Sequence, residues 1–206
     1  MTASERPLQE LLVMLIEQCN AEGGLLGRPL EAVIMDPRSD ARAYAHEGEL
    51  PAIAGPEMAG HLAAWSYLHA IDSPENRAFV AAWRKFCGAP NVVTDDPMEA
   101  TWISFNLWKE AVTRAGQVDV DHVRRALSGL RLRAPSGFEV FMDHANHHLH
   151  KPVVIGRITP DARIVQVWMS DHLIAPEPWS PWLNRAGSPD ARLIVSRDER
   201  ELALAS

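Results

Sequence analysis

The spacing of apolar residues predicts that the middle of the chain forms a long helix. From Met98 to Ala115 apolar residues recur at steps of three and four, which places them on one helix face. Asp96 stands before Pro97, with Glu99 three residues after Asp96, and this order is typical of an N-cap, a proline in the first turn and a capping-box acid. The face is rich in aromatic residues, so it requires a partner surface.

Three further helices are predicted on the same grounds. Asp119 opens one that runs towards Gly129, and Ser73 with Pro74 opens another. Ser4 is the expected cap of an N-terminal helix. The apolar side of that helix comprises Leu8, Leu11, Leu12, Leu15, Ile16 and Cys19. In the helix after Ser73 the expected buried residues are Phe79, Val80, Trp83 and Phe86.

Short strands are expected on both sides of the helical middle. A glycine-rich turn at residues 23–28 leads into a predicted buried strand at 30–35, as in part of an open α/β unit. After the helices, residues 138–142, 152–158 and 163–168 are separated by polar turns and predict an antiparallel meander. The pattern therefore indicates an α/β protein with antiparallel strands in its C-terminal half.

Composition narrows the range of functions. The chain has 206 residues, 47% of them hydrophobic, so it can bury a sizeable core. A formal charge of -7, with 20 Lys and Arg among 27 acids, argues against a nucleic-acid partner. Cys19 and Cys87 lack a CxxC spacing and are expected to be two unpaired thiols. The glycines at 23–27 lack a Gly-Lys-Ser/Thr ending and follow a helix, so no nucleotide or other cofactor is expected.

Five motifs from residue 96 onwards resemble those of a known family. In order they are DPMEA, APSG, NHHL and KPV, at residues 96–100, 134–137, 146–149 and 151–153, and PWSP, whose last three residues are 179–181. They are similar to the C-terminal part of type I periplasmic solute-binding proteins, in the branch that binds urea and short-chain amides. A GHLAAW strand at 60–65 resembles the same branch. The resemblance implies a partial type I, Rossmann-like fold.

The N-terminal part resembles the first lobe of the same family, and the two parts meet abruptly. Asn20, the glycines at 23–27 and the DP-SD sequence at 36–40 stand at first-lobe positions. Most of the first lobe and much of the second would then be missing near residues 44–47, as after an internal deletion. We therefore expect a first-lobe remnant at 1–45, a second-lobe and hinge remnant at 46–183, and a tail at 184–206 that is either a short helix or disordered.

The resemblance implies binding rather than catalysis. The expected function is that of a urea or short-chain amide receptor for an ABC permease, impaired by the deletion. The alternatives are a cytoplasmic amide sensor that restrains amidase expression, with an amidase-regulator partner, and a non-binding remnant or protein-interaction module. By the family pattern, the residues left near the cleft are Ser4, Glu5, His46 and Glu47, although caps and solvated loop residues are the favoured interpretation of all four.

Other chemistry finds little support in the sequence. Four histidines and Asp143 crowd into residues 143–150, but zinc sites usually draw ligands from two places, so a solvent-facing hairpin turn is favoured and no metal is expected. There is no Gly-x-Ser-x-Gly elbow, and Asp95 with Asp96 is better explained by helix capping. We therefore expect no enzyme activity.

Two expectations concern location and assembly. Residues 11–16 are apolar, but no basic segment precedes them and no cleavage site follows, so the protein as encoded is expected in the cytoplasm, whereas transporter members of the family are periplasmic. Deletion of partner surfaces should expose apolar area around four tryptophans, at positions 65, 83, 102 and 108. Homo-oligomerisation or a protein partner would cover that area.

Overall fold

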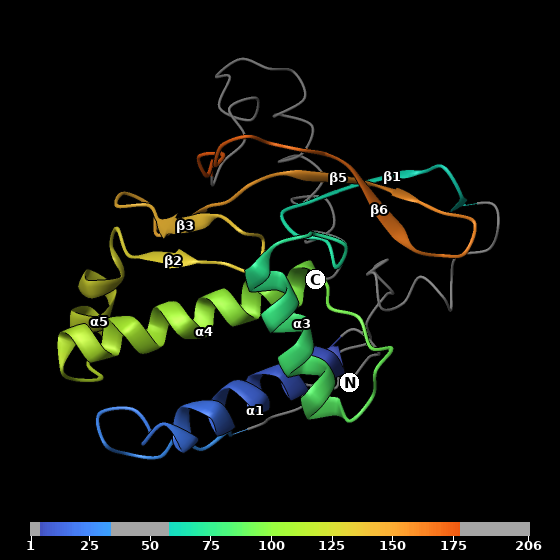
Figure 1. Cartoon of the computed structure of the whole chain (residues 1–206). Coiled ribbons are helices and arrows are strands. Elements are labelled where there is room, and N and C mark those ends of the chain that lie inside the picture. The colour runs from blue at the N-terminus through green and yellow to red at the C-terminus, as the bar shows by residue number, and fades with distance from the viewer. Residues whose placement is uncertain (1–4, 34–57, 178–206) are drawn as a thin grey trace, which may run out of the picture. The chain divides into compact units, whose positions relative to one another are not determined.

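The computed structural model describes residues 5–33 and 58–177 (Figure 1). By contacts the chain divides into two compact units, Met1–Ala175 and Pro176–Ser206, and the elements below all belong to the first. The helices are α1 (Glu5–Ala21), α3 (Pro74–Cys87), α4 (Asp96–Ala115) and α5 (Val120–Leu127). The strands are β1 (Leu62–Trp65), β2 (Arg131–Arg133), β3 (Glu139–Met142), β4 (Leu149–His150), β5 (Val154–Ile158) and β6 (Ile164–Met169). No described helix has the length and hydrophobicity needed to cross a membrane.

Three of the four helices begin where the sequence predicts or close to it, and their caps explain why. Ser73 accepts a hydrogen bond from the Asn76 N–H at the start of α3, as expected. Asp119 does the same for His122 N–H at the start of α5. The cap of α4 is Asp95, one residue before the predicted Asp96, and it accepts from Met98 N–H. The predicted cap of α1, Ser4, lies outside the described residues.

The prediction for the first turn of α4 is corrected in two further respects. Asp96 Oδ1 accepts a hydrogen bond from Ser66 N–H at 3.0 Å, so it ties α4 to the end of β1. Glu99 is not part of a capping box, because its side chain is fully buried and Oε1 accepts from Ser136 N–H at 2.8 Å. Lys151 Nζ lies 2.9 Å from Glu99 Oε2. A residue expected to be a capping-box acid thus forms a buried ion pair.

The strand predicted at 30–35 does not form over the described residues 30–33. The reason is that Asn20, near the end of α1, satisfies the backbone of Leu30. Asn20 Oδ1 accepts from Leu30 N–H at 2.7 Å, and Asn20 Nδ2 donates to Leu30 O at 2.8 Å. These side-chain bonds replace the ladder that a neighbouring strand would supply.

The remaining strands form two separate three-stranded antiparallel sheets. One has the order β1-β5-β6 and the other β2-β3-β4 (Figure 1). In the first, Trp65 pairs with Val154, and a register shift between Ile155 and Gly156 interrupts the pairing of β5 with β6. The prediction of antiparallel strands in this half is confirmed, although β5 pairs with the distant β1 rather than forming part of a continuous meander.

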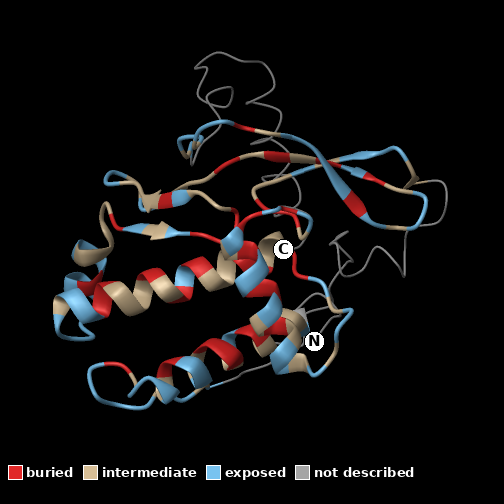
Figure 2. Cartoon of the chain, in the orientation of Figure 1, coloured by how far each residue is buried: buried red, intermediate tan, exposed pale blue. Residues whose placement is uncertain are grey.

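The core lies where α1, α3 and α4 pack together and against the strands (Figure 2). Fully buried side chains include Leu11, Tyr67, Leu68, Met98, Ile103, Leu107, Val112 and Val140. Of the four tryptophans expected to lose cover, Trp83 is buried and the other three are half-buried. Among the tryptophans of residues 5–33 and 58–177, a fifth, Trp168 on β6, is exposed, with half of its surface accessible. Cys19 and Cys87 are both free thiols, as predicted.

Candidate functional site

The structure does not describe the side chains proposed from the sequence as ligand-binding residues. Ser4, His46 and Glu47 lie outside the described residues, and Glu5 is described only as the first residue of the α1 backbone. These four assignments therefore remain predictions. The described residues nevertheless form a cavity next to the first turns of α1, the end of the helix that the resemblance places near the cleft.

This cavity, here called the His69 cavity, has a volume of about 650 Å³. That lies within the range of small-molecule sites, which are mostly apolar with a few polar groups. Five segments meet around it: the start of α1, the loop after β1, the end of α3, the loop before α4 and the β5–β6 hairpin. Its walls include Pro7, Glu10, His69, Trp83, Cys87, Asn91, Val92, Asp161, Arg163 and Val165.

A buried hydrogen-bonded network holds one wall of the cavity in place. Tyr67 hydroxyl donates to Asn76 Oδ1 at 2.6 Å and lies 2.5 Å from Thr94 Oγ1. Asn76 Nδ2 in turn donates to the carbonyl oxygens of His69, at 2.9 Å, and Ile71, at 2.7 Å. The loop after β1 is therefore fastened to α3 and to the loop before α4. A satisfied buried network of this kind fixes one geometry.

His69 is neutral at pH 7. Its Nδ1 accepts a hydrogen bond from Thr94 N–H at 3.2 Å, and its Nε2 lies 3.4 Å from Arg84 Nη2. Burial lowers the pKa of His69 below its ordinary value, and the nearby Arg84 charge lowers it further. The imidazole therefore presents a polar but uncharged edge at the cavity wall.

The charged groups that line the cavity are paired with each other or with neighbours on the same element. Glu10 accepts from Arg6 Nε at 2.7 Å, and Asp161 accepts from Arg163 Nε at 2.6 Å. Cys87 is half-buried in the wall, where burial and then the charge of Glu10 raise the pKa of its thiol. The lining thus carries polarity with little uncompensated charge.

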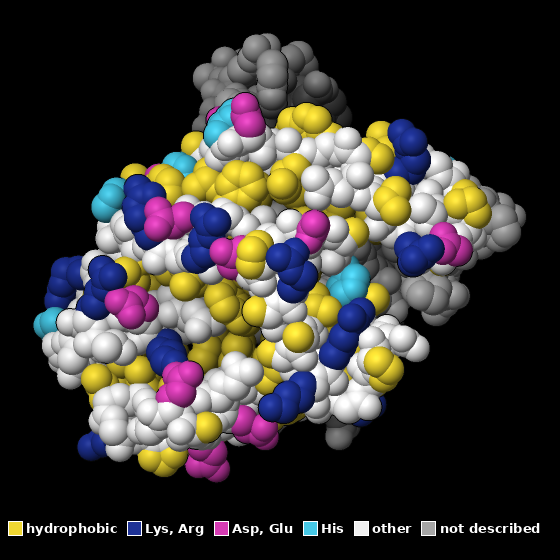
Figure 3. Space-filling model, in the orientation of Figure 1, with side chains coloured by type: hydrophobic (Ala, Val, Ile, Leu, Met, Phe, Trp, Pro, Cys, Tyr) yellow, Lys and Arg dark blue, Asp and Glu magenta, His cyan; other side chains and the backbone are white. Residues whose placement is uncertain are grey.

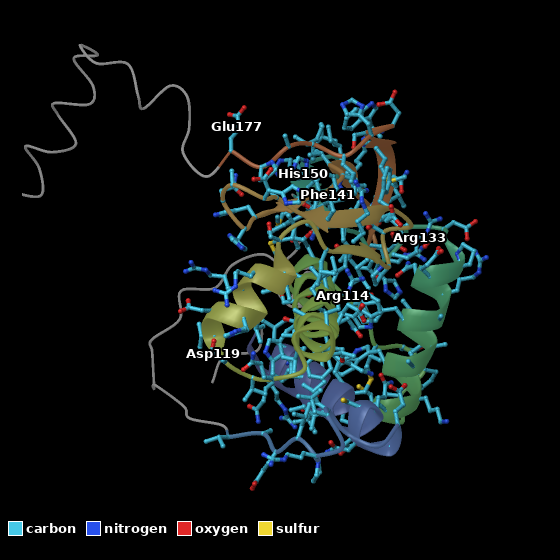
Figure 4. The ribbon with its side chains drawn as sticks, turned by 90° about the vertical axis from the view of Figure 1, so that its left-hand side faces the viewer. Arg114, Asp119, Arg133, Phe141, His150 and Glu177 are labelled. Carbon is cyan, nitrogen blue, oxygen red and sulfur yellow. The ribbon has the colours of Figure 1, made fainter. Side chains whose placement is uncertain are left out.

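The histidine-rich segment at 143–150 is a turn whose side chains have separate partners. His150 Nε2 lies 3.0 Å from Asp143 Oδ2, and its ring stacks on Phe141 with centroids 3.9 Å apart (Figure 4). The other partners are Ser128 for His144 and the Arg124 carbonyl for His147. Among residues 5–33 and 58–177, no three His, Cys, Asp or Glu side chains are grouped to hold a metal ion.

The sequence reasoning missed His69 and predicted only part of the role of Trp83. His69 stands in no motif, and only packing brings it beside Thr94 and Arg84, which are 25 and 15 residues away. Trp83 was expected to belong to the core, and it does, but the same ring also lines the cavity. The position of His69 between Thr94 and Arg84 can be recognised only from the three-dimensional arrangement.

Comparison with known proteins places these features in a family. Residues 1–51 and 46–185 match the periplasmic binding protein domain. A curated relative, limonene hydroxylase of Geobacillus stearothermophilus, is 31% identical over 120 residues, which are 58% of this chain and 22% of the relative. The chain therefore spans about a fifth of the length of that protein.

Two solved structures illustrate the shared fold. A solute-binding protein of an ABC transporter from Rhodopseudomonas palustris HaA2, in complex with p-hydroxybenzoic acid, is 25% identical with a TM-score of 0.53. One from Rhodopseudomonas palustris BisB5, in complex with 3,4-dihydroxybenzoic acid, is 22% identical with a TM-score of 0.54. The matches cover 63% and 64% of this chain but only 35% and 36% of those chains. The chain thus spans about a third of the length of these structures.

Proposed function

This chain belongs to the periplasmic binding protein domain family, and from that premise we propose that it binds a small neutral solute of the urea and short-chain amide class. The His69 cavity is the proposed site, and an ABC permease is the proposed partner. The observation that carries the proposal is the electrostatic balance of this cavity. A carboxylate or ammonium ligand loses hydration on entry and needs an opposite charge, whereas a neutral amide needs only hydrogen bonds.

The lining supports a neutral ligand. Glu10 and Asp161 are each engaged by an arginine, so neither offers an unpaired anion to a cationic solute. His69 is uncharged at neutral pH because of burial and Arg84, so it does not attract an anion. Asn91 is an exposed lining residue whose amide can both donate and accept, which matches the C=O and NH₂ groups of an amide. Trp83 supplies an apolar wall.

We further propose that the chain is an internally shortened member of the family. The family match falls into two segments, 1–51 and 46–185, which meet close to the junction expected from the sequence at 44–47. Most of the binding residues implied by the resemblance fall in the missing part, so affinity should be weak. Sequencing the genomic locus tests this. If the locus encodes the missing middle segment in the same reading frame, the gene carries no deletion.

An aromatic acid is the second candidate ligand, and the position of Arg84 favours it. Its guanidinium donates to Val92 O at 3.3 Å and approaches His69, and it forms no salt bridge with a carboxylate of the described residues. A benzoate seated against Trp83 would bring its carboxylate towards that charge. The Rhodopseudomonas palustris proteins solved with hydroxybenzoic acids supply the precedent for this class of ligand.

Calorimetry with urea, acetamide, 4-hydroxybenzoate and leucine separates the candidates. Urea and acetamide each have four non-hydrogen atoms, so even at the limit of about −1.5 kcal/mol per atom their Kd is about 40 μM at the tightest. Titrations therefore need protein at or above that concentration. Heat with the amides alone supports the first candidate, and heat with the benzoate alone supports the second. Absence of heat with all four compounds would overturn solute binding.

The location of the site is tested by labelling Cys87. It is the accessible thiol, because Cys19 is 1% exposed. Its raised pKa makes the thiolate scarce at pH 7, so methyl methanethiosulfonate is applied near pH 8.5. A bound ligand should slow the reaction several-fold, and Cys87→Ser gives the background from Cys19. Binding without protection would place the site elsewhere.

A pair of substitutions on β6 gives a matched control. Val165 lines the cavity and Val167 does not, yet both are on the same strand and are exposed to 43% and 44%. Val165→Trp should therefore weaken ligand binding at least tenfold, while Val167→Trp should leave it within about twofold. Equal effects of the two variants would contradict the assignment of the His69 cavity.

A further inference from the structure

A second recess lies between α1, α3 and α4, apart from the His69 cavity. It has a volume of about 300 Å³. Met14 and Gln18 of α1, Phe79 of α3 and Trp102 of α4 line it, with Glu75 and Arg133 on the side of β2. In Figure 3, hydrophobic side chains, coloured yellow, form the bottom of a hollow between these helices. No lining residue is shared with the His69 cavity.

Glu75 gives the recess a polar group whose hydrogen bonding is incomplete. Its Oε1 accepts from Arg133 Nε at 2.9 Å, and Figure 4 shows Arg133 beside the upper end of α3. Its Oε2 is shielded from solvent and has no hydrogen-bond partner among the described residues, while the Glu75 side chain as a whole is 29% exposed. The bond to Arg133 lowers the pKa of Glu75, so the group is ionised at neutral pH. A buried carboxylate oxygen without a donor is costly, and a ligand or water donor relieves that cost.

The walls of the recess are aromatic and rigid. Phe79 is 4% exposed, and its ring meets that of Trp102 edge to face with centroids 6.2 Å apart. Met14, which adapts to irregular shapes, is 3% exposed. A flat apolar body can pack against these side chains, with a donor pointing to Glu75 Oε2.

We propose that this recess, the Glu75 recess, is a second ligand site for a small neutral molecule that has a planar apolar body and an N–H donor, as in an aromatic primary amide. The site goes beyond the proposed function, since it does not depend on any ligand in the His69 cavity. The donor hydrogen-bonds Glu75 Oε2, and the body contacts Phe79 and Trp102.

Charge selects the neutral form of such a ligand. Arg133 already neutralises Glu75, so an added ammonium group would leave a net positive charge in the recess. A carboxylate in the same place would face Glu75 Oε2 with no proton to share and would be repelled. The preferred order is therefore amide over ammonium, and ammonium over carboxylate.

Three compounds of similar size test that order: benzamide, benzylammonium and benzoate. Binding is followed by calorimetry and by one-dimensional ligand NMR with the full chain at neutral pH. Benzamide should bind at least tenfold more tightly than benzoate, with benzylammonium between them. The comparison is repeated in Val165→Trp, which blocks the His69 cavity, and equal affinities or tightest binding by benzoate in that variant would overturn the proposal.

Two alanines on α3 provide the matched variants. Ala82 lines the recess and Ala81, its neighbour, is exposed. Ala82→Leu fills the recess and should reduce benzamide affinity at least tenfold, whereas Ala81→Leu should stay within twofold. Both variants are checked by circular dichroism and thermal melting. Unchanged affinity in folded Ala82→Leu would refute the site.

Glu75→Gln gives a second measurement should Ala82→Leu fail to fold. The amide removes the charge with little change in size, so discrimination between benzamide and benzoate should fall at least fivefold. Retained discrimination would contradict the role of Glu75.

Val165→Trp should leave benzamide binding intact, which separates this site from the His69 cavity. If acetamide and urea give no heat but benzamide still binds, the proposed function fails while this inference stands.

Discussion

Replacing Lys151 with methionine should destabilise the protein, because it leaves the buried carboxylate of Glu99 without its cationic partner. The Glu99 side chain is fully buried and that of Lys151 is 15% exposed, and their charged atoms are 2.9 Å apart. Asp96 Oδ1 lies further away, 3.8 Å from the same Nζ. Glu99 Oε2 makes no aligned hydrogen bond within the described chain, so Lys151 contributes chiefly its charge.

The magnitude follows from the separation of the charges. At 2.9 Å and an effective dielectric of about 20, the Coulomb attraction is about 6 kcal/mol, and the desolvation of the two groups opposes it. Loss of one partner from a buried pair typically costs about 3–5 kcal/mol, since the remaining charge stays buried. For a domain of this size that corresponds to a fall in Tm of about 6–20 °C.

The cost should depend on pH in a defined direction. Burial raises the pKa of Glu99 above its ordinary value of 4.5, and Lys151 opposes that rise. Between the unfolded and the raised folded pKa, the folded state binds more protons, so stability falls as pH rises through that window. Without Lys151 the folded pKa rises further and the window widens. Lys151→Met should therefore lose more stability at pH 8 than at pH 5.

Unfolding in guanidinium chloride at both pH values measures this, and urea is avoided because it is a proposed ligand. Lys109→Met is the matched control, because Lys109 pairs with Glu22 at 2.6 Å on the surface and should contribute only about 0–1 kcal/mol. The double variant Glu99→Gln with Lys151→Met should recover part of the loss. A loss below about 1 kcal/mol, or one that is the same at both pH values, would refute the reasoning.

Three further predictions concern other parts of the molecule. Gly156→Ala should cost about 1–3 kcal/mol of unfolding free energy by chemical denaturation, because the added Cβ would lie 2.2 Å from Ile164 Cγ2 in a buried site. Stability should rise with pH from the lowered folded pKa of His69 up to its unfolded value near 6.5, and His69→Gln should flatten that slope in thermal melts. The described edge strand β6 exposes Val167 and Trp168, so light scattering should detect self-association that Val167→Lys reduces. A monomer at high concentration would contradict the last.

The candidate sites show how far sequence patterns reach. Glu75 is recognisable from sequence as an acid in the first turn of a helix, but its neighbour Arg133 is 58 positions away. Glu99 matches a capping box by spacing, yet α4 places it against Ser136 and Lys151 instead. Such assignments fail because a helix position specifies a direction for the side chain but not what lies opposite.

The sequence by itself determined the local elements and the family. Apolar periodicity and the capping residues Ser73 and Asp119 located the helices, because a cap acts within three residues of itself. Only the tertiary structure decided that the Asn20 side chain hydrogen-bonds the backbone of Leu30, so that no strand forms there. It also decided that β5 pairs with β1, some 90 residues earlier in the chain. It also decided which side chains meet around His69 and Glu75. Contacts between distant segments depend on the packing of whole elements, which no local pattern encodes.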